Sequence, residues 1–487
     1  MLIFGMPVPV INIEQMREWE RVTWNSGQTE AEVIRRVGQH LARVASRMSR
    51  PGESILILAG KGNNGADAIQ AREFLKDRLV EVLSIADPAA DLGRIETALA
   101  ARPALIIDGL FGIGLNRPLS PEWARFIEVL NNANRPVLAV DVPSGLNADT
   151  GQPQAVAVVA TVTLTVGAPK VGCLQSVSWP FVGRLEVADE VGLIPCPASS
   201  ELHWTLPVDF REFPPPRLIS GHKGTYGHLA IIAGSLGFHG AAVIAAKGAQ
   251  RAQPGLITLH TQEQVYHSVS AQLQQTMVSP SLPAGRQLGN YSAILAGPGL
   301  AAPDAKEYAA AIVRQAWREV HVPVVIDASA LDWLGTDAFP KNAIRVVTPH
   351  PGEAARILRS TSKTGQMDRL ATLRQVSGRL NNCIVVLKGH QTLIGRSTGE
   401  VFVNSSGNPH LAQGGSGDLL GGYIAGLLVQ PALRSDPIQT VCFAVWQHGA
   451  CADYLQAKSR NWTIEELSQE LGNCSGDGLV PAGTTSA

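Results

Sequence analysis

The chain lacks paired cysteines and an excess of charge of either sign. Its six cysteines are scattered and no C-x-x-C motif occurs, which argues against the common zinc sites and against a disulfide scaffold. The 40 basic and 41 acidic side chains nearly balance, so there is no broad basic field to bind nucleic acid. These absences favour a globular protein with reduced thiols, and we expect a cytoplasmic location.

Long apolar runs are also absent. No stretch of about 18 apolar residues is present to span a membrane. The apolar start, MLIFGMPVPVIN, has no basic region before it and soon meets Glu14 and Arg17, so we do not interpret it as a signal peptide. We therefore expect neither a membrane nor a nucleic acid as a partner.

Short apolar strands alternate with helical segments along most of the 487 residues. Continuous apolar runs of this length are typical of strands buried on both faces of a parallel sheet, which predicts a doubly wound α/β fold. In the first half the predicted strands are Ile55–Gly60, Val80–Ile85, Ala104–Asp108 and Val137–Asp141, with helical segments at Ile13–Met48, Ile69–Lys76 and Pro121–Leu130. In the second half strands are predicted from Leu229, Leu256, Ala293, Val324, Arg345 and Ile384.

Proline clusters interrupt this alternation between Pro195 and Pro216, where no clear element is predicted. Such a segment is typical of a linker between domains. We predict one domain over residues 1–213 and a second over residues 214–474. The remaining residues, 475–487, are rich in small and polar side chains and are predicted to be a disordered tail.

Three polar loops of the first half follow predicted strands: GKGNNGADA, DGLFGIGLNRP and DVPSGLNADTG. Each alone is explained by turn chemistry or by a helix cap, but three in one sheet favour a small-molecule site at the carboxyl ends of the strands. Asn64, Asp108 and Ser144 offer hard oxygen ligands for a cation, and Asp141 is able to move a proton.

The second half contains GGSGD, which ends in Asp418 and precedes an apolar helix. Glycines before a helix crowd backbone N–H groups into an anion hole, and a carboxylate at its rim can take the proton of an attacking hydroxyl. The alternative is a glycine-rich helix start with Asp418 as a cap. KGHQT and TPHPGE supply further polar residues after buried strands, and the absence of G-x-x-x-x-G-K-[ST] excludes a P-loop kinase.

The first-half motifs, together with TVGAPKVG, resemble those of the NAD(P)H-hydrate epimerases, which interconvert the R and S epimers at C6 of hydrated NADH and NADPH (NADHX and NADPHX). The resemblance implies a Rossmann-like N-terminal domain, with potassium at Asn64, Asp108 and Ser144 and with Asp141 as the acid that binds substrate and handles the proton. The implied substrate loops are Asn63, Asn64, Gly65, Ala66 and Asp67, and Gly112, Ile113, Gly114, Leu115, Asn116, Arg117 and Pro118.

The second-half motifs HKGTYG, AGSLGFHGAA, AGPGL, VVIDASAL, TPHPGE, VVLKG and GNPHLAQGGSGD resemble the ribokinase-like NAD(P)H-hydrate dehydratases. The resemblance implies phosphorylation of the C6 hydroxyl of the S epimer by ADP or ATP with magnesium, followed by loss of phosphate to give NAD(P)H. It makes Asp418 the base and implies a homo-oligomer. The implied nucleotide site is Lys388, Gly389, His390, Gln391, Thr392 and Gly417, and the implied hydrate site is Ala242, Gly299, His350 and Asp418.

The chain departs from these patterns at a few positions. Ala66 and Ala68 stand where the epimerases usually have glycine, and a β-carbon there would weaken binding if either position needed a positive φ or a close approach to ligand. Ser329 and Ser416 replace an aspartate and a threonine of the dehydratase pattern. The alternative function is a ribokinase-like kinase for a vitamin precursor or sugar, with a non-catalytic N-terminal ligand-binding domain.

Overall fold

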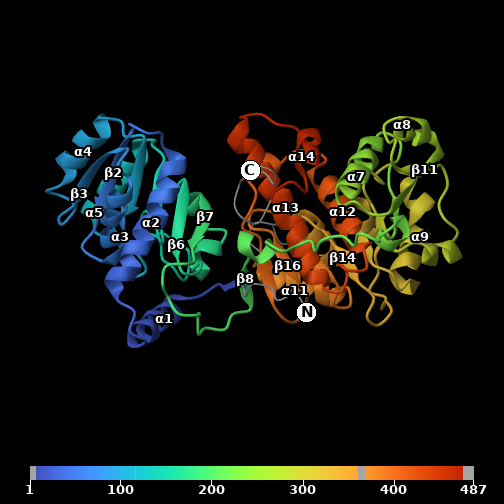
Figure 1. The fold of residues 1–487 in the computed structure, drawn as a ribbon, viewed down its shortest axis with the longest axis horizontal. Helices are drawn as coiled ribbons and strands as arrows, with labels where there is room; N and C mark the ends of the chain where they lie inside the picture. The colour runs from blue at the N-terminus through green and yellow to red at the C-terminus, as the bar shows by residue number, and fades with distance from the viewer. Residues whose placement is uncertain (1–6, 116, 360–367, 475–487) are drawn as a thin grey trace. The chain divides into compact units, whose positions relative to one another are not determined.

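A computed structural model describes residues 7–115, 117–359 and 368–474. The chain divides into two compact units, an N-terminal unit of residues Val8–Trp204 and a C-terminal unit that begins at Thr205 (Figure 1). Asn116 and the predicted disordered tail lie outside the described residues.

The N-terminal unit is built on a parallel sheet with the strand order β3-β2-β4-β5-β6-β7. Its strands are β2 (Ser54–Ala59), β3 (Leu79–Ser84), β4 (Leu105–Gly109), β5 (Val137–Val140), β6 (Val162–Val166) and β7 (Arg184–Ala188). The short strands β1 (Val8–Pro9) and β8 (Leu202–Trp204) pair with each other in antiparallel fashion and are not part of this six-stranded sheet.

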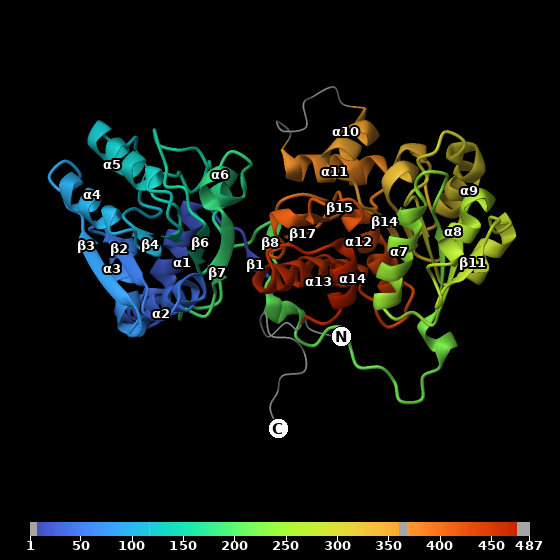
Figure 2. The ribbon, with the colours of Figure 1, turned by 90° about the horizontal axis from the view of Figure 1, so that it is seen from above.

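Helices cover both faces of this sheet (Figure 2). Alternate strand residues face opposite sides, so Ile55 and Ile57 pack with α2 and α3, whereas Leu56 and Leu58 pack with α4 and α5. The helices are α1 (Ile13–Asn25), α2 (Glu30–Met48), α3 (Asn63–Ala71), α4 (Leu92–Ala100), α5 (Pro121–Asn132) and α6 (Trp179–Val182). The doubly wound arrangement predicted for this half is confirmed.

The predicted helical region Ile13–Met48 is confirmed as two helices, because Asn12 and Thr29 each cap a helix start. Two other local predictions for the N-terminal unit are wrong. The helix predicted from Ile69 begins at Asn63, since the glycine-rich turn after β2 already has helical backbone. The segment Pro195–Pro216 contains β8 and a 3₁₀ helix, Pro207–Phe210.

The C-terminal unit has the strand order β17-β16-β15-β14-β13-β12-β9-β10-β11. The strands from β15 to β11 are parallel, and β16 and β17 add antiparallel pairs beside β15. Its strands are β9 (His228–Ile232), β10 (Leu256–His260), β11 (Met277–Ser279), β12 (Ala293–Ala296), β13 (Val324–Ile326), β14 (Arg345–Val347), β15 (Ile384–Leu387), β16 (Leu393–Gly395) and β17 (Val401–Val403).

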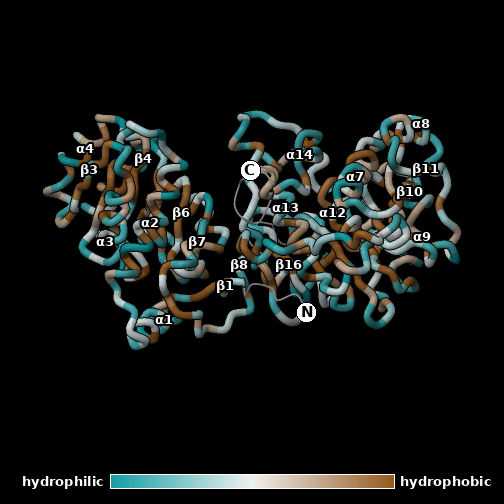
Figure 3. Tube along the Cα trace, viewed as in Figure 1, coloured by the Kyte–Doolittle hydropathy of each residue, from teal (hydrophilic) through white to brown (hydrophobic). Residues whose placement is uncertain are grey.

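Helices of the C-terminal unit also form two layers, with α10 and α11 over one face of the sheet and α13 and α14 over the other (Figure 2). The hydropathy trace shows apolar stretches along the strands of each unit (Figure 3). The helices are α7 (His239–Arg251), α8 (Tyr266–Ser270), α9 (Ala305–Glu319), α10 (Pro351–Leu358), α11 (Arg369–Arg379), α12 (Ser416–Leu428), α13 (Pro437–Lys458) and α14 (Ile464–Glu470).

Glycines fix the position of α12, the helix that carries Asp418. A β-carbon on Gly422 would lie 1.9 Å from the carbonyl oxygen of Ala245 in α7, and one on Gly248 would lie 2.2 Å from that of Leu419. The two helix backbones therefore touch, and no larger residue fits at either position. This contact holds the first turn of α12 at the carboxyl ends of the parallel strands.

Candidate active sites

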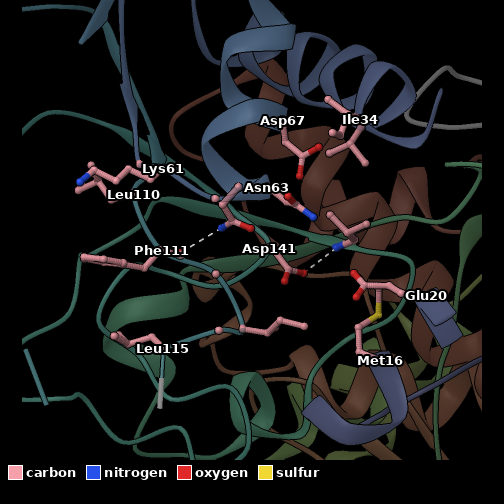
Figure 4. A pocket seen from close by; sticks show the side chains of 18 of the residues that line it. Met16, Glu20, Ile34, Lys61, Asn63, Asp67, Leu110, Phe111, Leu115 and Asp141 are labelled. Carbon is pink, nitrogen blue, oxygen red and sulfur yellow. Dashed lines mark hydrogen bonds between the residues drawn. The ribbon is translucent and has the colours of Figure 1, made fainter. Parts of the chain in front are cut away.

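The N-terminal unit encloses a cavity of about 590 Å³. The loops after β2, β4 and β5 form one part of its wall, and α1 and α2 form another (Figure 4). This is the carboxyl end of the parallel strands, where ligands of doubly wound sheets bind. The structure thus places residues of all three predicted polar loops around one space.

Asn64, Asp108 and Ser144 lie together beside this cavity. Ser144 donates to Asp108 from its hydroxyl, at 2.6 Å, and from its backbone N–H, at 2.9 Å. The Asn64 amide nitrogen donates to the carbonyl oxygens of Phe111, at 3.0 Å, and Val140, at 2.7 Å.

Burial raises the pKa of Asp108, and the hydrogen bonds from Ser144 and Leu110 offset part of that rise. A buried carboxylate, a hydroxyl and a side-chain amide are the donor types that a hard monovalent cation accepts. Their positions fit the predicted potassium site.

Asp141 follows β5 and has an unusual backbone, with φ of +64°. Its Oδ1 atom accepts hydrogen bonds from Lys170 Nζ at 2.5 Å, from the Val166 N–H at 3.0 Å and from the Thr165 hydroxyl at 3.1 Å. Lys170 is fully buried, so the pair is an internal ion pair. The positive φ places strain at this residue, as is frequent where a side chain must point at a ligand.

Two more carboxyl groups, those of Glu20 and Asp67, line the same cavity (Figure 4). Burial raises the pKa of Glu20, and the Asp141 carboxylate adds to the rise. The pKa of Asp67 is raised well above its usual range, by burial first and then by Asp141 and Glu20. The sequence analysis missed Glu20 and Lys170 as functional residues. Only the lysine had a signal, within the motif TVGAPKVG.

The predicted substrate loops reach the cavity only in part. Its lining includes Asn63, Asn64, Asp67, Gly112, Ile113, Gly114, Leu115 and Arg117, but not Gly65, Ala66 or Pro118. A β-carbon on Gly65 would lie 2.1 Å from the carbonyl oxygen of Gly60, so this glycine is needed for close packing of α3 on the sheet.

Ala66 and Ala68 both lie within α3, where the backbone φ is negative. Ala68 is fully buried among the core residues between the sheet and helices α2 and α3. Neither position has the positive φ that would require glycine, and the methyl group of Ala68 packs in the core away from the cavity.

In the C-terminal unit, Asp418 lies in the first turn of α12. The N-cap of this helix is Gly415, with φ of +94° and no side-chain cap, so the alternative of Asp418 as a cap is not what the structure has. The first amides of α12 are therefore left without a capping side chain, as an anion hole requires.

Three charged side chains surround Asp418. Lys388 Nζ lies 2.9 Å from Asp327 Oδ1 and 3.9 Å from Glu353 Oε2, and it is also 3.2 Å from the place that a β-carbon on Gly417 would take. Burial raises the pKa of Asp418 to about 7, and the carboxylates of Asp327 and Glu353 add to the rise, while Lys388 opposes it.

Burial alone would lower the pKa of Lys388, but Asp327, Glu353 and Asp418 raise it. The ammonium group thus carries its charge among three carboxyl groups. The sequence analysis missed Asp327, although its place at the end of a buried strand was the signal that singled out Asp108 and Asp141.

The other predicted hydrate-site residues of this unit differ in burial and in what their side chains contact. His350 caps α10, with Nδ1 accepting from the Gly352 N–H at 3.0 Å, while its ring is half exposed. Ala242 is fully buried, so only its backbone is able to touch a ligand. Gly299 has φ of +65°, and a β-carbon there would lie 2.3 Å from the carbonyl oxygen of Phe238.

The predicted nucleotide loop Lys388–Thr392 contains two residues with positive φ, Gly389 at +140° and Gln391 at +52°. Both side-chain amide atoms of Gln391 are buried without a hydrogen-bond partner among the described residues. Buried polar atoms without partners are uncommon and mark a place where a ligand can bind.

His448 of α13 was also missed by the sequence analysis. Burial lowers its pKa to about 4, and a hydrogen bond with the Ser416 backbone places its ring beside the start of α12. A histidine inside an apolar helix gives no sequence signal that separates it from a core residue.

Comparisons with known proteins agree with this geometry. A family model described as NAD(P)H-hydrate dehydratase matches residues 229–473, and one described as YjeF-related protein N-terminus matches residues 30–99 and 84–172. The bifunctional NAD(P)H-hydrate repair enzyme Nnr of Moorella thermoacetica is 34% identical over 477 residues, covering 88% of this chain and 87% of that protein. The chain belongs to the bifunctional NAD(P)H-hydrate repair enzymes.

Another repair enzyme of this name, from Gloeobacter violaceus, is 32% identical and covers 95% of this chain and 96% of its own. A solved ribokinase-like superfamily protein from Enterococcus faecalis is 26% identical with a TM-score of 0.50, covering 56% of this chain and 95% of that one. The predicted family and the predicted pairing of a Rossmann-like with a ribokinase-like domain are confirmed. Among the described helices of this repair enzyme, none has the length and apolar character to cross a bilayer.

Proposed function

We propose that the N-terminal unit epimerises the R and S forms of NADHX and NADPHX at C6, and that the C-terminal unit dehydrates the S form at the expense of ADP or ATP. The observation that carries this proposal is the pair of acids in separate polar sites, Asp141 beside Lys170 and Asp418 at the uncapped start of α12. Each is an acid suited to proton transfer at a hydroxyl-bearing carbon.

In the N-terminal cavity, Asp141 exchanges a proton with the oxygen atom at C6 of the substrate. Lys170 supplies the opposite charge, and the hydrogen bonds from Thr165 and Val166 fix the direction of the carboxylate. Asn64, Asp108 and Ser144 would hold potassium, whose positive charge would compensate the buried Asp108 carboxylate. The loop residues Asn63 and Gly112 to Leu115 orient the substrate above it.

In the C-terminal unit, Asp418 takes the proton of the C6 hydroxyl as its oxygen attacks the terminal phosphorus of the nucleotide. The backbone N–H groups at the start of α12 stabilise the charge on the transferred phosphoryl group. Loss of phosphate from C6 and of a proton from C5 then forms the double bond of NAD(P)H.

The nucleotide would bind along Lys388 to Thr392, with Gln391 supplying the polar atoms that lack partners. Magnesium bound with the nucleotide would neutralise charge on its phosphates. The side chains of Asp327 and Glu353 lie within this charged group and would orient Lys388 toward the phosphates. Gly299, His350 and the backbone at Ala242 would line the hydrate side.

The test is to incubate the S epimer of NADHX with magnesium and either ADP or ATP and to measure NADH and inorganic phosphate. The proposal predicts that the two products appear together in equal amounts. A stable phosphorylated product without NADH would instead indicate a kinase of the same fold. Separately, the R epimer is incubated without nucleotide, and conversion to S faster than the spontaneous exchange is expected.

A further inference from the structure

The cavity of the N-terminal unit presents a further carboxyl group in addition to that of Asp141. Glu20 comes from α1, whereas Asp141 follows β5, so the two approach the cavity from different elements. Figure 4 shows both carboxyl groups directed into the same space. A substrate bound between α1 and the strand ends would lie within this space and be exposed to both groups.

The surroundings of the two groups differ. Asp141 carries its own counter-charge, because Lys170 Nζ lies 2.5 Å from it and is fully buried. Glu20 has no recorded hydrogen bond or ion pair among the described residues and is only partly buried, with its remaining surface on the cavity. The charged groups that act on Glu20 are Arg17 of its own helix and Asp67, Asp141, Lys170 and Glu30 of other elements.

Most of these neighbours are carboxylates, so they favour the protonated form of Glu20. Burial has the same effect, and the pKa of Glu20 is raised. Two carboxyl groups whose surroundings differ in this way are suited to act as an acid and a base in one reaction. Epimerisation at a carbon that bears a hydroxyl group and a ring nitrogen needs both.

We propose that Glu20 is the catalytic acid that protonates the C6 hydroxyl of the hydrate, with Asp141 as the base on the opposite face. This inference rests on the proposed epimerase function. The Glu20 proton moves to the hydroxyl oxygen, the C6–O bond breaks to release water, and the N1 lone pair forms a C6–N1 double bond. A water molecule then adds to C6 on the other face, its proton passes to Asp141, and the electron pair returns to N1.

The step is balanced, because Glu20 loses one proton and Asp141 gains one. The reverse reaction or exchange with solvent restores both groups. The step also predicts that the oxygen at C6 is replaced by solvent oxygen each time the configuration inverts. Inversion by opening of the ring between N1 and C6 would not require that replacement.

The experiment compares the full-length wild type with E20Q, E14Q and D67N. Glu14 is an exposed residue of the same helix, so E14Q is the matched control. The rate of exchange between the R and S epimers is measured without nucleotide as a function of pH, with incorporation of labelled oxygen from water. Dehydration of the S epimer by the same preparations reports on folding of the C-terminal unit, and urea unfolding followed by a signal from the N-terminal unit reports on the unit that carries Glu20.

We expect E20Q to slow the exchange by about 10²-fold or more, and E14Q to leave it unchanged. The wild-type rate should fall as the pH rises through the pKa of Glu20, and this decline should be missing from the residual activity of E20Q. Three results would overturn the proposal. They are near wild-type exchange in E20Q, loss of the decline in rate at high pH in D67N in place of E20Q, and retention of the original oxygen at C6. A wild type that does not exceed spontaneous exchange would overturn the epimerase function itself.

Discussion

Asp141 in the N-terminal unit and Asp418 in the C-terminal unit are both acids at the carboxyl ends of parallel strands, but their charges are balanced in different ways. Asp141 has a buried lysine 2.5 Å away. Asp418 has no recorded ion pair within the described residues, and its nearest cation, Lys388, is bound to Asp327. Asp141 therefore has its counter-charge within the free chain, whereas Asp418 does not.

This difference indicates what each site needs from its ligands. In the N-terminal site the Asp141 carboxylate already has its counter-charge, Lys170, before substrate binds. This suits a reaction in which no second substrate brings a charge to the site. In the C-terminal site the pKa of Asp418 is raised to about 7, so the carboxyl group is close to half protonated at neutral pH. A nucleotide bound at Lys388, as proposed, would change this balance and so couple the protonation of Asp418 to the presence of the phosphoryl donor.

The largest expected effects come from removing each acid in turn. D418A should reduce dehydration by about 10²–10⁴-fold and leave epimer exchange unchanged, because the base of only one site is lost. The measurement is NADH formation from the S epimer with ADP or ATP, beside epimer exchange in the same preparation. Dehydration at a near wild-type rate would remove Asp418 as the base.

The reciprocal change is D141N, which keeps the size of the side chain. Epimer exchange should fall by about 10²–10⁴-fold while dehydration of the pure S epimer is retained. Chromatographic separation of the two epimers follows the exchange. If D141N epimerised as fast as the wild type, the base of the N-terminal site would lie elsewhere.

Removing the Lys170 ammonium group should lower the stability of the N-terminal unit. K170M leaves the Asp141 carboxylate buried without its ammonium partner, which costs about 3–5 kcal/mol in the free energy of unfolding. Urea unfolding, followed by a signal from the N-terminal unit, measures the loss. The double variant K170M/D141N should recover part of it, and equal stability of K170M and wild type would contradict an internal ion pair.

The pH dependence should separate the two activities. Asp418 acts in its anionic form and its pKa is raised to about 7, so kcat/KM for dehydration should fall about tenfold per pH unit below that value and level off above it. D327N removes one of the carboxylates that raise this pKa and should move the decline to lower pH. A value of kcat/KM for dehydration that does not fall as the pH drops below neutrality would contradict the raised pKa of Asp418 and its role as the base.

The smallest effect concerns the two alanines of α3. A66G and A68G should each lower stability by about 1 kcal/mol, because glycine is the poorer helix former and Ala68 fills core space. Neither should raise the rate of epimer exchange, since neither position needs a positive φ. Thermal unfolding and the exchange assay test both points, and a faster exchange in A66G would restore the glycine requirement.

Much of the architecture was predictable because buried parallel strands read as continuous apolar runs. The strands at Val137 and Leu256 start where they were predicted, whereas the antiparallel strands β16 and β17 were not predicted. Asp108 and Asp141 were predicted as site residues for the same reason, because each stands at the end of such a run.

Glu20, Lys170 and His448 were not singled out by the sequence analysis. Glu20 and His448 lie within helices, and Lys170 lies in a loop that reaches Asp141 only through the tertiary fold. Their roles depend on distances across the fold, which spacing along the sequence does not carry.

The most direct test of the central claim, two complementary sites in one chain, is the recovery of NADH from a mixture of R and S NADHX. The full chain is incubated with magnesium, potassium and ADP or ATP, and the absorbance of NADH is followed to its end point. The account predicts recovery of both epimers faster than they exchange spontaneously. Recovery that stops at the S fraction would contradict a functional N-terminal site, and no recovery with either nucleotide would contradict the account as a whole.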